Sequence, residues 1–338
     1  MPVSLKDVAK EAGLSPASVS RHLNGTLDLP VETRDRIEKA VQRLGYRPNP
    51  HARRLSLGRS DIITLVVPDI ANPFFAVLAS AIEKASSEKG KIVQLHATSS
   101  AEAREIAVLQ MAADNRSDGV VFCTNHRPGD ELAEALSDLP KVVIVDEAVN
   151  GANAPQIFAD NEEGGYLAGR HFAQWKHRNI AYIGGHPELM STQLRVDGLE
   201  RGLRDGHAAA QTAVNKFFGT HDMFTGRALA AQMLDGNGGE TGIFVGSDEL
   251  AIGVIETLRA RGIRIPEDMS LISFDGTRAL HLYDPPITAV HQPAKQLGER
   301  AVQVLLDGDW STGEILQQVE LLPVELIERA SVAAPNTT

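Results

Sequence analysis

The most constraining feature of this sequence is a regular alternation of short apolar runs with helical patterns after about residue 61. Helical patterns such as FAVLASAIEKASSEKG and DELAIGVIETLRARGI separate the apolar runs. Such alternation produces parallel sheets that are covered by helices. More than seven strands over roughly 270 residues predict an α/β fold with two subdomains. The runs that predict strands are ITLVVPDI, KIVQLHA, DGVVFC, KVVIVDE, PQIFADN, NIAYIGG, GIFVGSD and MSLISFDG.

Several of the predicted strands end in an aspartate. These residues are Asp69, Asp146, Asp160, Asp248 and Asp275. Ligands of open parallel sheets bind beyond the carboxyl ends of the strands, so the aspartates predict a polar cleft there. The alternative is that each aspartate only caps the helix that follows it.

The distribution of charge separates a small basic segment from an acidic remainder. Residues 1–60 hold eleven Lys and Arg against six Asp and Glu, a net charge of +5. The whole chain carries −11, so the remainder carries −16. A basic head on an acidic body indicates a head that binds a polyanion, although chance clustering of solvated charges gives the same numbers.

Composition also favours a cytoplasmic protein. The only cysteine is Cys123, which excludes an internal disulfide and suits a reducing compartment. The first residues, MPVSLKDVAKEAG, are charged where a signal peptide needs an apolar stretch. No window has the ~18 consecutive apolar residues of a membrane helix.

The first sixty residues predict a helix-turn-helix. Apolar residues from Leu5 to Ala12 recur at helical spacing, and Gly13 ends that helix. Ser15 is a good N-cap and Pro16 suits the first position of a second helix, which runs to about residue 24. A third amphipathic helix spans residues 31–44 and covers the apolar side of the first two. The short connection with its glycine is typical of a helix-turn-helix, although other three-helix bundles share it.

The segments LKDVAKEAGLSPASVSRHLNG and ETRDRIEKAVQRLGYRPNPHARRL resemble the DNA-binding head of LacI–GalR repressors without gaps over about 57 residues. The resemblance implies that the second helix enters the major groove, with Pro16, Ala17 and Arg21 at the base-reading positions. Arg21 can bind guanine, whereas Pro16 and Ala17 offer only apolar contact. The family positions that contact the DNA backbone fall on Lys6, Ser15, Ser18, Ser20, Asn24, Thr33, Tyr46 and Asn49.

The same resemblance assigns a role to residues 49–60. Asn49 and Pro50 can begin a helix of about two turns, which is too short to be stable alone. In the family this hinge helix folds on the operator and inserts a leucine into the minor groove. Leu55 occupies that position, with Arg53 and Arg54 adding positive charge, and ordinary interdomain packing of Leu55 is the alternative.

The body resembles the family more loosely, through VVPDIANPFFAVLASAIE, DNEEGGYLAGRHF and GSDELAIGVIETLRARGIRIPEDMSLISFDG. The resemblance implies two lobes like those of periplasmic sugar-binding proteins, with a small effector, a sugar or sugar derivative, between them. It implies an effector arginine at Arg195 and acceptor positions at Asp248 and Asp275. The full expected effector set is Asn72, Phe74, Phe75, Thr124, Asp146, Asp160, Arg195, His221, Asp248 and Asp275.

The predicted organisation is a helix-turn-helix domain at 1–48, a hinge at 49–60 and an effector-binding and dimerisation domain at 61–330. Lobe one is expected at 61–160 and 291–322, and lobe two at 161–290 and 323–330. Three chain crossings are expected near Asn161, between Pro285 and Pro293, and near Pro323. The tail ERASVAAPNTT has no leucine heptad, which favours a homodimer over a tetramer.

The predicted function is a ligand-responsive transcriptional regulator, a repressor, that binds a palindromic operator and needs no cofactor or metal. A solute-binding protein and an architectural DNA binder with a vestigial pocket are the alternatives. An enzyme is disfavoured because no GxSxG, Walker A or GxGxxG motif occurs. GNGGETG at 236–242 comes near to the last of these and predicts a surface turn.

Overall fold

A computed structural model describes residues 3–25, 27–46, 60–115, 117–127, 129–206, 211–236 and 238–336. The chain divides into two compact units, Met1–Asp61 and Ile62–Thr338. The predictions for Asn49, Arg53, Arg54 and Leu55 concern residues outside the described part of the chain.

The first unit is the predicted three-helix head. Its helices are α1 (Leu5–Ala12), α2 (Pro16–Leu23) and α3 (Val31–Leu44). Val8, Val19 and Ile37, one from each helix, are fully buried at its centre. A core of this kind fixes the angle at which α2 is presented to its surroundings.

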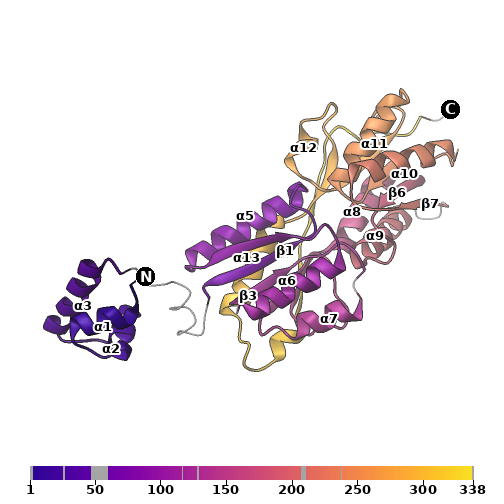
Figure 1. Cartoon of the computed structure of the whole chain (residues 1–338). Helices are drawn as coiled ribbons and strands as arrows, with labels where there is room; N and C mark the ends of the chain where they lie inside the picture. The colour runs from indigo at the N-terminus through magenta and orange to yellow at the C-terminus, as the bar shows by residue number, and fades with distance from the viewer. Residues whose placement is uncertain are drawn as a thin grey trace. The chain divides into compact units, whose positions relative to one another are not determined.

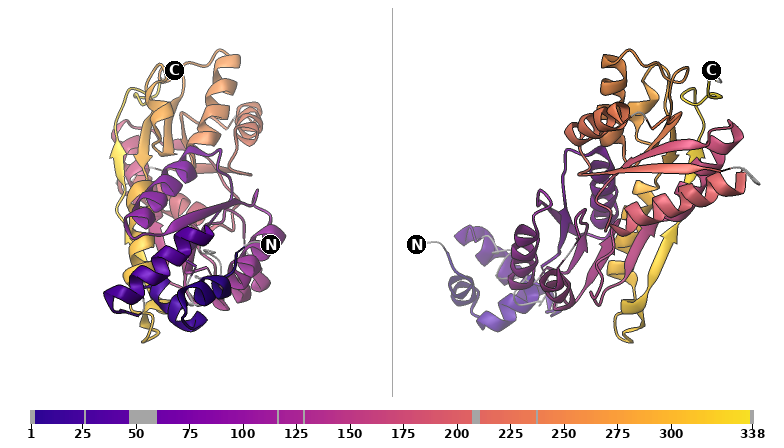
Figure 2. Two further views of the ribbon diagram at one scale, coloured as in Figure 1. Left: turned by 60° about the vertical axis from the view of Figure 1, so that its left-hand side comes forward. Right: turned by 90° about the vertical axis from the view of Figure 1, so that its right-hand side faces the viewer.

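The second unit contains two six-stranded sheets, each in its own lobe (Figures 1 and 2). The strand order of the first sheet is β11-β5-β4-β3-β1-β2, and all its pairs are parallel. Its strands are β1 (Ile62–Val67), β2 (Ile92–Ala97), β3 (Gly119–Phe122), β4 (Val142–Val145), β5 (Gln156–Ala159) and β11 (Val319–Leu322).

The second sheet has the order β12-β10-β9-β8-β6-β7. Only the β10–β12 pair is antiparallel. Its strands are β6 (Asn179–Gly184), β7 (Ala213–Phe218), β8 (Gly242–Val245), β9 (Ser270–Asp275), β10 (Thr288–His291) and β12 (Glu325–Ile327).

Helices cover both faces of each sheet, which confirms the predicted α/β class. In the first lobe, α5 (Pro73–Glu88) and α13 (Ala294–Asp307) pack on one face. The other face carries α6 (Glu102–Asp114) and α7 (Asp130–Ser137). In the second lobe the corresponding layers are α8 (Asn161–Gln174) with α9 (Met190–Gly206), and α10 (Met223–Asp235) with α11 (Asp248–Ala260). The short elements α12 (Arg278–His281) and η1 (Glu314–Gln317) lie in connections.

The chain passes between the two sheets three times. It leaves the first sheet after Ala159, returns between β10 and α13, and leaves again between Leu322 and Glu325. The last passage continues β11 into β12 along one side of both lobes, drawn in yellow in Figure 2. Three connections of this kind form a hinge between two bodies. None of the described helices is long and apolar enough to span a bilayer.

Close packing of α8 on α9 positions the middle of the cleft. A Cβ on Gly165 would collide with the Arg195 carbonyl, and one on Gly198 with the Glu162 carbonyl. Glycine at these positions therefore lets the two helix backbones touch. This contact holds the backbone of Arg195 beside the start of α8.

Candidate functional site

The turn between α1 and α2 is held in place by local hydrogen bonds. Gly13 adopts a left-handed φ of 64° and ends α1, as glycine does most easily. The Ser15 hydroxyl accepts a hydrogen bond from the Ser18 N–H at 3.1 Å and caps α2. The Arg36 guanidinium donates to the Ala12 carbonyl at 2.5 Å, which ties α3 to the turn. These contacts are the local reason why the sequence folds into a helix-turn-helix.

The outer face of α2 is polar and accessible. Pro16, Ala17 and Arg21 are exposed, as are Ser15 and Lys6, whereas Val19 of the same helix is fully buried. The other predicted backbone-contacting residues of the described head are half-buried: Ser18, Ser20, Asn24, Thr33 and Tyr46. Tyr46 packs against the core of the head, and the hydroxyls of Ser15 and Ser18 lie 2.9 Å apart.

A second candidate site is a cleft at the carboxyl ends of both sheets. Residues from both lobes line it, and they follow strands β1, β3, β4, β6, β7, β8, β9 and β10. Eight of the ten predicted effector residues are in the lining, namely Asn72, Phe74, Phe75, Thr124, Asp146, Arg195, His221 and Asp275. The residues that sequence reasoning missed are Asn125, Glu147, Leu189, Ser191, Ser247 and Gln292.

Arg195 is held rigidly in this cleft. Its Nε donates to Asn161 Oδ1 at 2.8 Å and its Nη1 to the Gly246 carbonyl at 2.5 Å. The guanidinium carbon lies 3.7 Å from the ring centroid of Phe274, a cation–π contact. The side chain is buried and well supported, so the guanidinium is preorganised at the centre of the cleft.

Phe74 and Phe75 form the apolar wall at the start of α5. Each is 4% exposed, and their rings meet edge to face with centroids 5.1 Å apart. Both also pack in the core under α5. Asn72 caps α5 by accepting from the Phe74 N–H at 2.9 Å. Thr124 is fully buried, and its hydroxyl donates to Glu105 at 3.2 Å.

Asp160 and Asp248 do not line the cleft. Asp160 accepts from the Glu163 N–H at 3.0 Å and caps α8. The Asp248 carboxyl accepts from the Ser273 hydroxyl at 2.6 Å and from the Thr277 N–H at 2.5 Å. Their carboxyl groups therefore hold protein backbone and loops together.

Asp275 does line the cleft, in a backbone conformation with φ of 94°. Its carboxyl accepts from Gln292 Nε2 at 2.6 Å and from the Asp248 N–H at 3.2 Å. Gln292 follows β10, on the passage between the lobes, so this contact joins the end of β9 to the hinge.

Glu147 joins the two lobes at the cleft. It follows β4 of the first lobe, and its carboxylate accepts from the N–H of Met190 at 2.7 Å and of Ser191 at 3.3 Å. The Ser191 hydroxyl donates to it at 2.6 Å. A carboxylate is favourable at a helix N-terminus, so Glu147 caps α9 of the second lobe. We call this set of contacts the interlobe cap.

Burial controls the ionisation of two lining residues. Burial raises the pKa of Asp146 to about 8, with Arg195 opposing the shift and Glu147 and Asp275 adding to it. Burial and the charge of Arg195 lower the pKa of His221 to about 4, so this imidazole is neutral at pH 7. The cavity volume is about 40 Å³, enough for a few water molecules. Binding of a larger molecule therefore requires movement of side chains or lobes.

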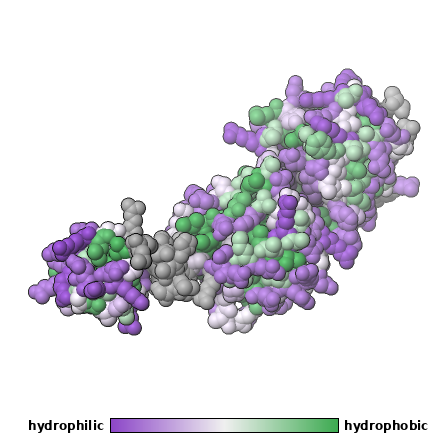
Figure 3. All heavy atoms as spheres, viewed as in Figure 1, coloured by the Kyte–Doolittle hydropathy of each residue, from purple (hydrophilic) through white to green (hydrophobic). Residues whose placement is uncertain are grey.

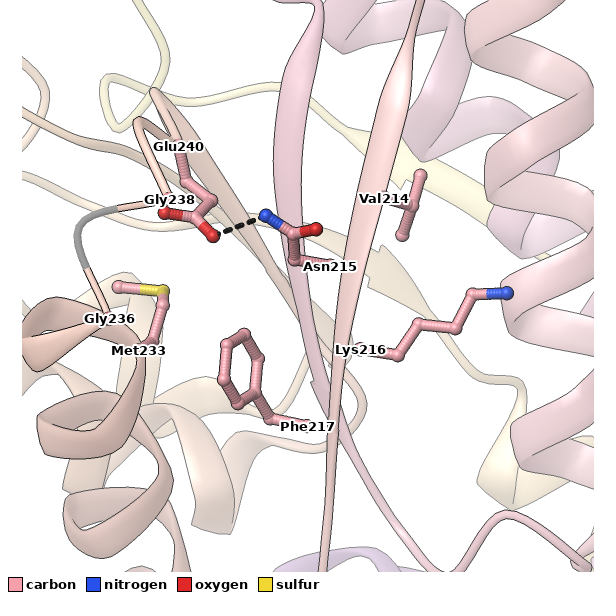
Figure 4. Close-up of a pocket in the computed structure, with 8 residues that line it drawn as sticks. All are labelled: Val214, Asn215, Lys216, Phe217, Met233, Gly236, Gly238 and Glu240. Carbon is pink, nitrogen blue, oxygen red and sulfur yellow. Dashed lines mark hydrogen bonds between the residues drawn. The ribbon is translucent and has the colours of Figure 1, made fainter.

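A separate hollow lies at the β7 edge of the second sheet (Figure 4). Asn215 and Phe217 face it from β7, and the Asn215 amide donates to the Glu240 carboxylate at 2.6 Å. Lys216 extends from the other face of the strand and pairs with Glu200 at 2.6 Å. Because these polar groups pair with one another, the cleft between the lobes is the better candidate for a ligand site.

Comparison with known proteins finds one match within each of the two units. Residues 4–49 match the model of bacterial regulatory proteins of the lacI family, and residues 170–332 match a periplasmic binding protein-like domain. The HTH-type transcriptional repressor PurR of Vibrio atlanticus is 31% identical over 98% of this chain and 99% of its own length. The HTH-type transcriptional regulator DegA of Bacillus subtilis (strain 168) is 30% identical over the whole of both chains.

Solved structures agree with these relatives. The lac repressor dimer bound to operator and the anti-inducer ONPF superposes with a TM-score of 0.82 and 25% identity. That match covers 99% of this chain and 100% of the repressor chain. The transcriptional regulator CelR in complex with cellobiose has a TM-score of 0.71 and 27% identity, covering 97% and 99% of the two chains.

A helix-turn-helix head on a two-lobed, ligand-binding body defines a DNA-binding transcriptional regulator of the repressor type rather than an enzyme. With full-length relatives at 30% identity or more, the family is established. The chain belongs to the lacI family of bacterial regulatory proteins.

Proposed function

We propose that this chain is a homodimeric repressor whose affinity for a palindromic operator is set by a small polyhydroxylated effector, a sugar or sugar derivative, in the cleft. The observation that carries the proposal is the preorganised Arg195, which lies in one cleft with an aromatic wall and acceptor side chains from both lobes. A guanidinium donates to two hydroxyl oxygens at once, and an aromatic wall suits the apolar face of a sugar ring.

The ligands bound in related structures support the sugar class. One relative is CelR, solved with cellobiose. Another is a LacI family regulator from Enterococcus faecium with bound ribose, which superposes with a TM-score of 0.72 and 26% identity. That match covers 81% of this chain and 100% of the other.

In the head, we propose that α2 enters the major groove with Arg21 reading a guanine. Its exposed face, with Pro16 and Ala17 beside Arg21, supports this assignment. Lys6 and the polar residues around the turn then contact phosphates and set the register. Leu55, outside the described residues, is proposed as the minor-groove wedge, with Arg53 and Asn49 beside it.

Exposed apolar side chains support pairing of two bodies. Figure 3 shows apolar side chains gathered over α5, where Val77 is 48% exposed. Two copies related by a twofold axis would cover such surfaces and present two heads to the two halves of a palindrome. The other exposed large apolar residues of the described body are Ile70, Ile92, Leu95, Trp175, Phe224, Leu282, Val319 and Leu321.

Effector binding between the lobes would change the interlobe angle and with it the distance between the hinge segments of a dimer. Such coupling is typically about 1–3 kcal/mol and acts equally in both directions. A thermal-shift screen of sugars, sugar acids, polyols and purines tests the ligand half of the proposal. A ligand at about 100 times its Kd adds about 2.7 kcal/mol of stability. Operator titration with each hit tests the regulatory half, and a hit that leaves operator affinity unchanged contradicts it.

A further inference from the structure

We propose that the effector of this cleft is a polyhydroxylated molecule that carries a protonated amine and no carboxylate or phosphate group. The proposal rests on the proposed function, because it names the ligand class of the same cleft. It is based on which polar groups of the cleft have hydrogen-bond partners within the protein and which have none among the described residues.

The charges that line the cleft favour a cation over an anion. Asp146, Glu147 and Asp275 contribute three carboxyl groups, of which Asp146 is largely protonated at pH 7, and Arg195 contributes the only guanidinium among the described lining residues. His221 adds no positive charge, because burial lowers its pKa to about 4. An anionic ligand in this low-dielectric space would face an excess of like charge, whereas an ammonium group would reduce that excess.

The protein already uses part of the hydrogen-bonding capacity of the positive groups in the cleft. Arg195 donates to Asn161 and to the Gly246 carbonyl, and it stacks on Phe274. The N-terminus of α9 is a natural place for an anion, but the Glu147 carboxylate occupies it through three hydrogen bonds. A phosphate or carboxylate would have to displace this internal carboxylate to gain the same donors.

Two buried acceptor oxygens of the lining lack partners. Asn125 Oδ1 and Gln292 Oε1 are buried without a hydrogen-bond partner among the described residues. The orientation of Gln292 is fixed by the bond from its Nε2 to Asp275, so the oxygen is the end left over. Buried acceptors without donors are costly, and ligand hydroxyl and ammonium groups supply the donors that these atoms need.

Asp146 is the place for the ammonium group. Among the residues that the structure describes, none donates a hydrogen bond to its carboxyl group, although it lines the cleft. Its pKa of about 8 is set by burial, opposed by Arg195 and increased by the neighbouring Glu147 and Asp275. A cation beside it would lower this pKa, so amine binding near pH 7.5 should release a proton.

The test uses the full-length chain and a charge-matched panel of hexoses. For the gluco, galacto and manno series, the 2-amino sugar, the parent sugar, the uronic acid and the 6-phosphate are compared by thermal shift and calorimetry at pH 7.5. We expect the best amine to bind at least about tenfold more tightly than its parent sugar, equivalent to 1.4 kcal/mol. Calorimetry in two buffers of different ionisation enthalpy should show proton release for that amine. An acid or phosphate that binds more tightly than its parent sugar overturns the proposal.

A second experiment needs no ligand and tests the proposal even if no sugar of the panel changes the melting temperature. In the free protein, Asp146→Asn removes an unpartnered buried carboxyl, so its melting temperature should exceed that of the wild type at pH 8.5. The gain should be smaller at pH 5.5, where Asp146 is protonated. The matched control is Asp222→Asn, because the Asp222 carboxylate accepts from the N–H and hydroxyl of Thr225 and should lose stability at pH 8.5.

A lower melting temperature for Asp146→Asn at both pH values would show that the carboxylate already has donors, and it would overturn the proposal. Operator binding is measured on the same wild-type preparation, so that a wrong ligand class can be distinguished from a wrong proposed function. If operator binding is intact but the amino sugars bind no more tightly than their parent sugars, the result counts against the proposed ligand class alone. Absence of operator binding counts against the proposed function.

Discussion

The interlobe cap makes Glu147→Ala the most informative single substitution in the body. The change removes a carboxylate that is 3% exposed and accepts three hydrogen bonds from the start of α9. Two backbone N–H groups and one hydroxyl at the start of α9, and the N–H of Ala148, lose their acceptor, at about 1–3 kcal/mol for each group left unsatisfied. Water entering the cleft and relief of the buried charge offset part of this loss. We therefore expect a net destabilisation of about 2–3 kcal/mol.

For a domain of this size, about 1 kcal/mol corresponds to about 2–4 °C in melting temperature, so Glu147→Ala should lower the melting temperature of the body by about 4–12 °C. Calorimetry of the full chain measures this directly. The matched control is Glu188→Ala, which breaks the exposed interlobe ion pair with Arg127. Exposed pairs contribute about 0–1 kcal/mol, so the control should melt close to the wild type. The reasoning is refuted if Glu147→Ala melts like the wild type, or if both variants lose the same stability.

Three further substitutions test other parts of the account. Arg21→Ala should weaken binding to the selected operator by about 1–3 kcal/mol and relax one base position, whereas Lys6→Ala should weaken binding to all duplexes alike in fluorescence-anisotropy titrations. An unchanged base preference for Arg21→Ala would count against the base-reading role. Arg195→Ala should abolish the ligand response in thermal shift while operator binding persists, and a retained response would remove this residue from the ligand site. Gly198→Ala places a methyl against the Glu162 carbonyl, which should cost about 3 kcal/mol or more in urea unfolding; a loss below 1 kcal/mol would contradict the close helix contact.

The layered fold could be predicted from the sequence because its signals are local and repeated. Each of the eight predicted strands is present, and Gly13 and Ser15 end and begin helices as expected. Strands such as β7, in which no residue is fully buried, lack the continuous apolar run that identifies a buried parallel strand. The pattern that revealed the other strands is therefore absent there.

The cleft was predictable in position but not in every residue. A strand-end aspartate marks the correct edge of the sheet. The sequence does not show which carboxyl groups accept hydrogen bonds from the protein and which line the cleft. Asp160 caps α8 and Asp248 binds Ser273 and the loop after β9, whereas Asp146 and Asp275 line the cleft.

Glu147 was missed although it stands directly after Asp146 in KVVIVDE. Its role depends on the start of α9, 43 residues further along the chain. A contact of this kind is set by the angle between two lobes, and no local pattern encodes it. The second acidic residue after the strand was the only available signal.

We propose that this one chain couples a DNA-binding head to a ligand-binding cleft. The most direct test is the Kd of the full chain for a duplex that it selects from a random library, measured with and without a ligand shown to bind the cleft. We expect retention of the selected duplex at low salt and a change in Kd of at least about fivefold on adding the ligand. No retention of any duplex, or the same Kd with the cleft empty and saturated, would contradict it.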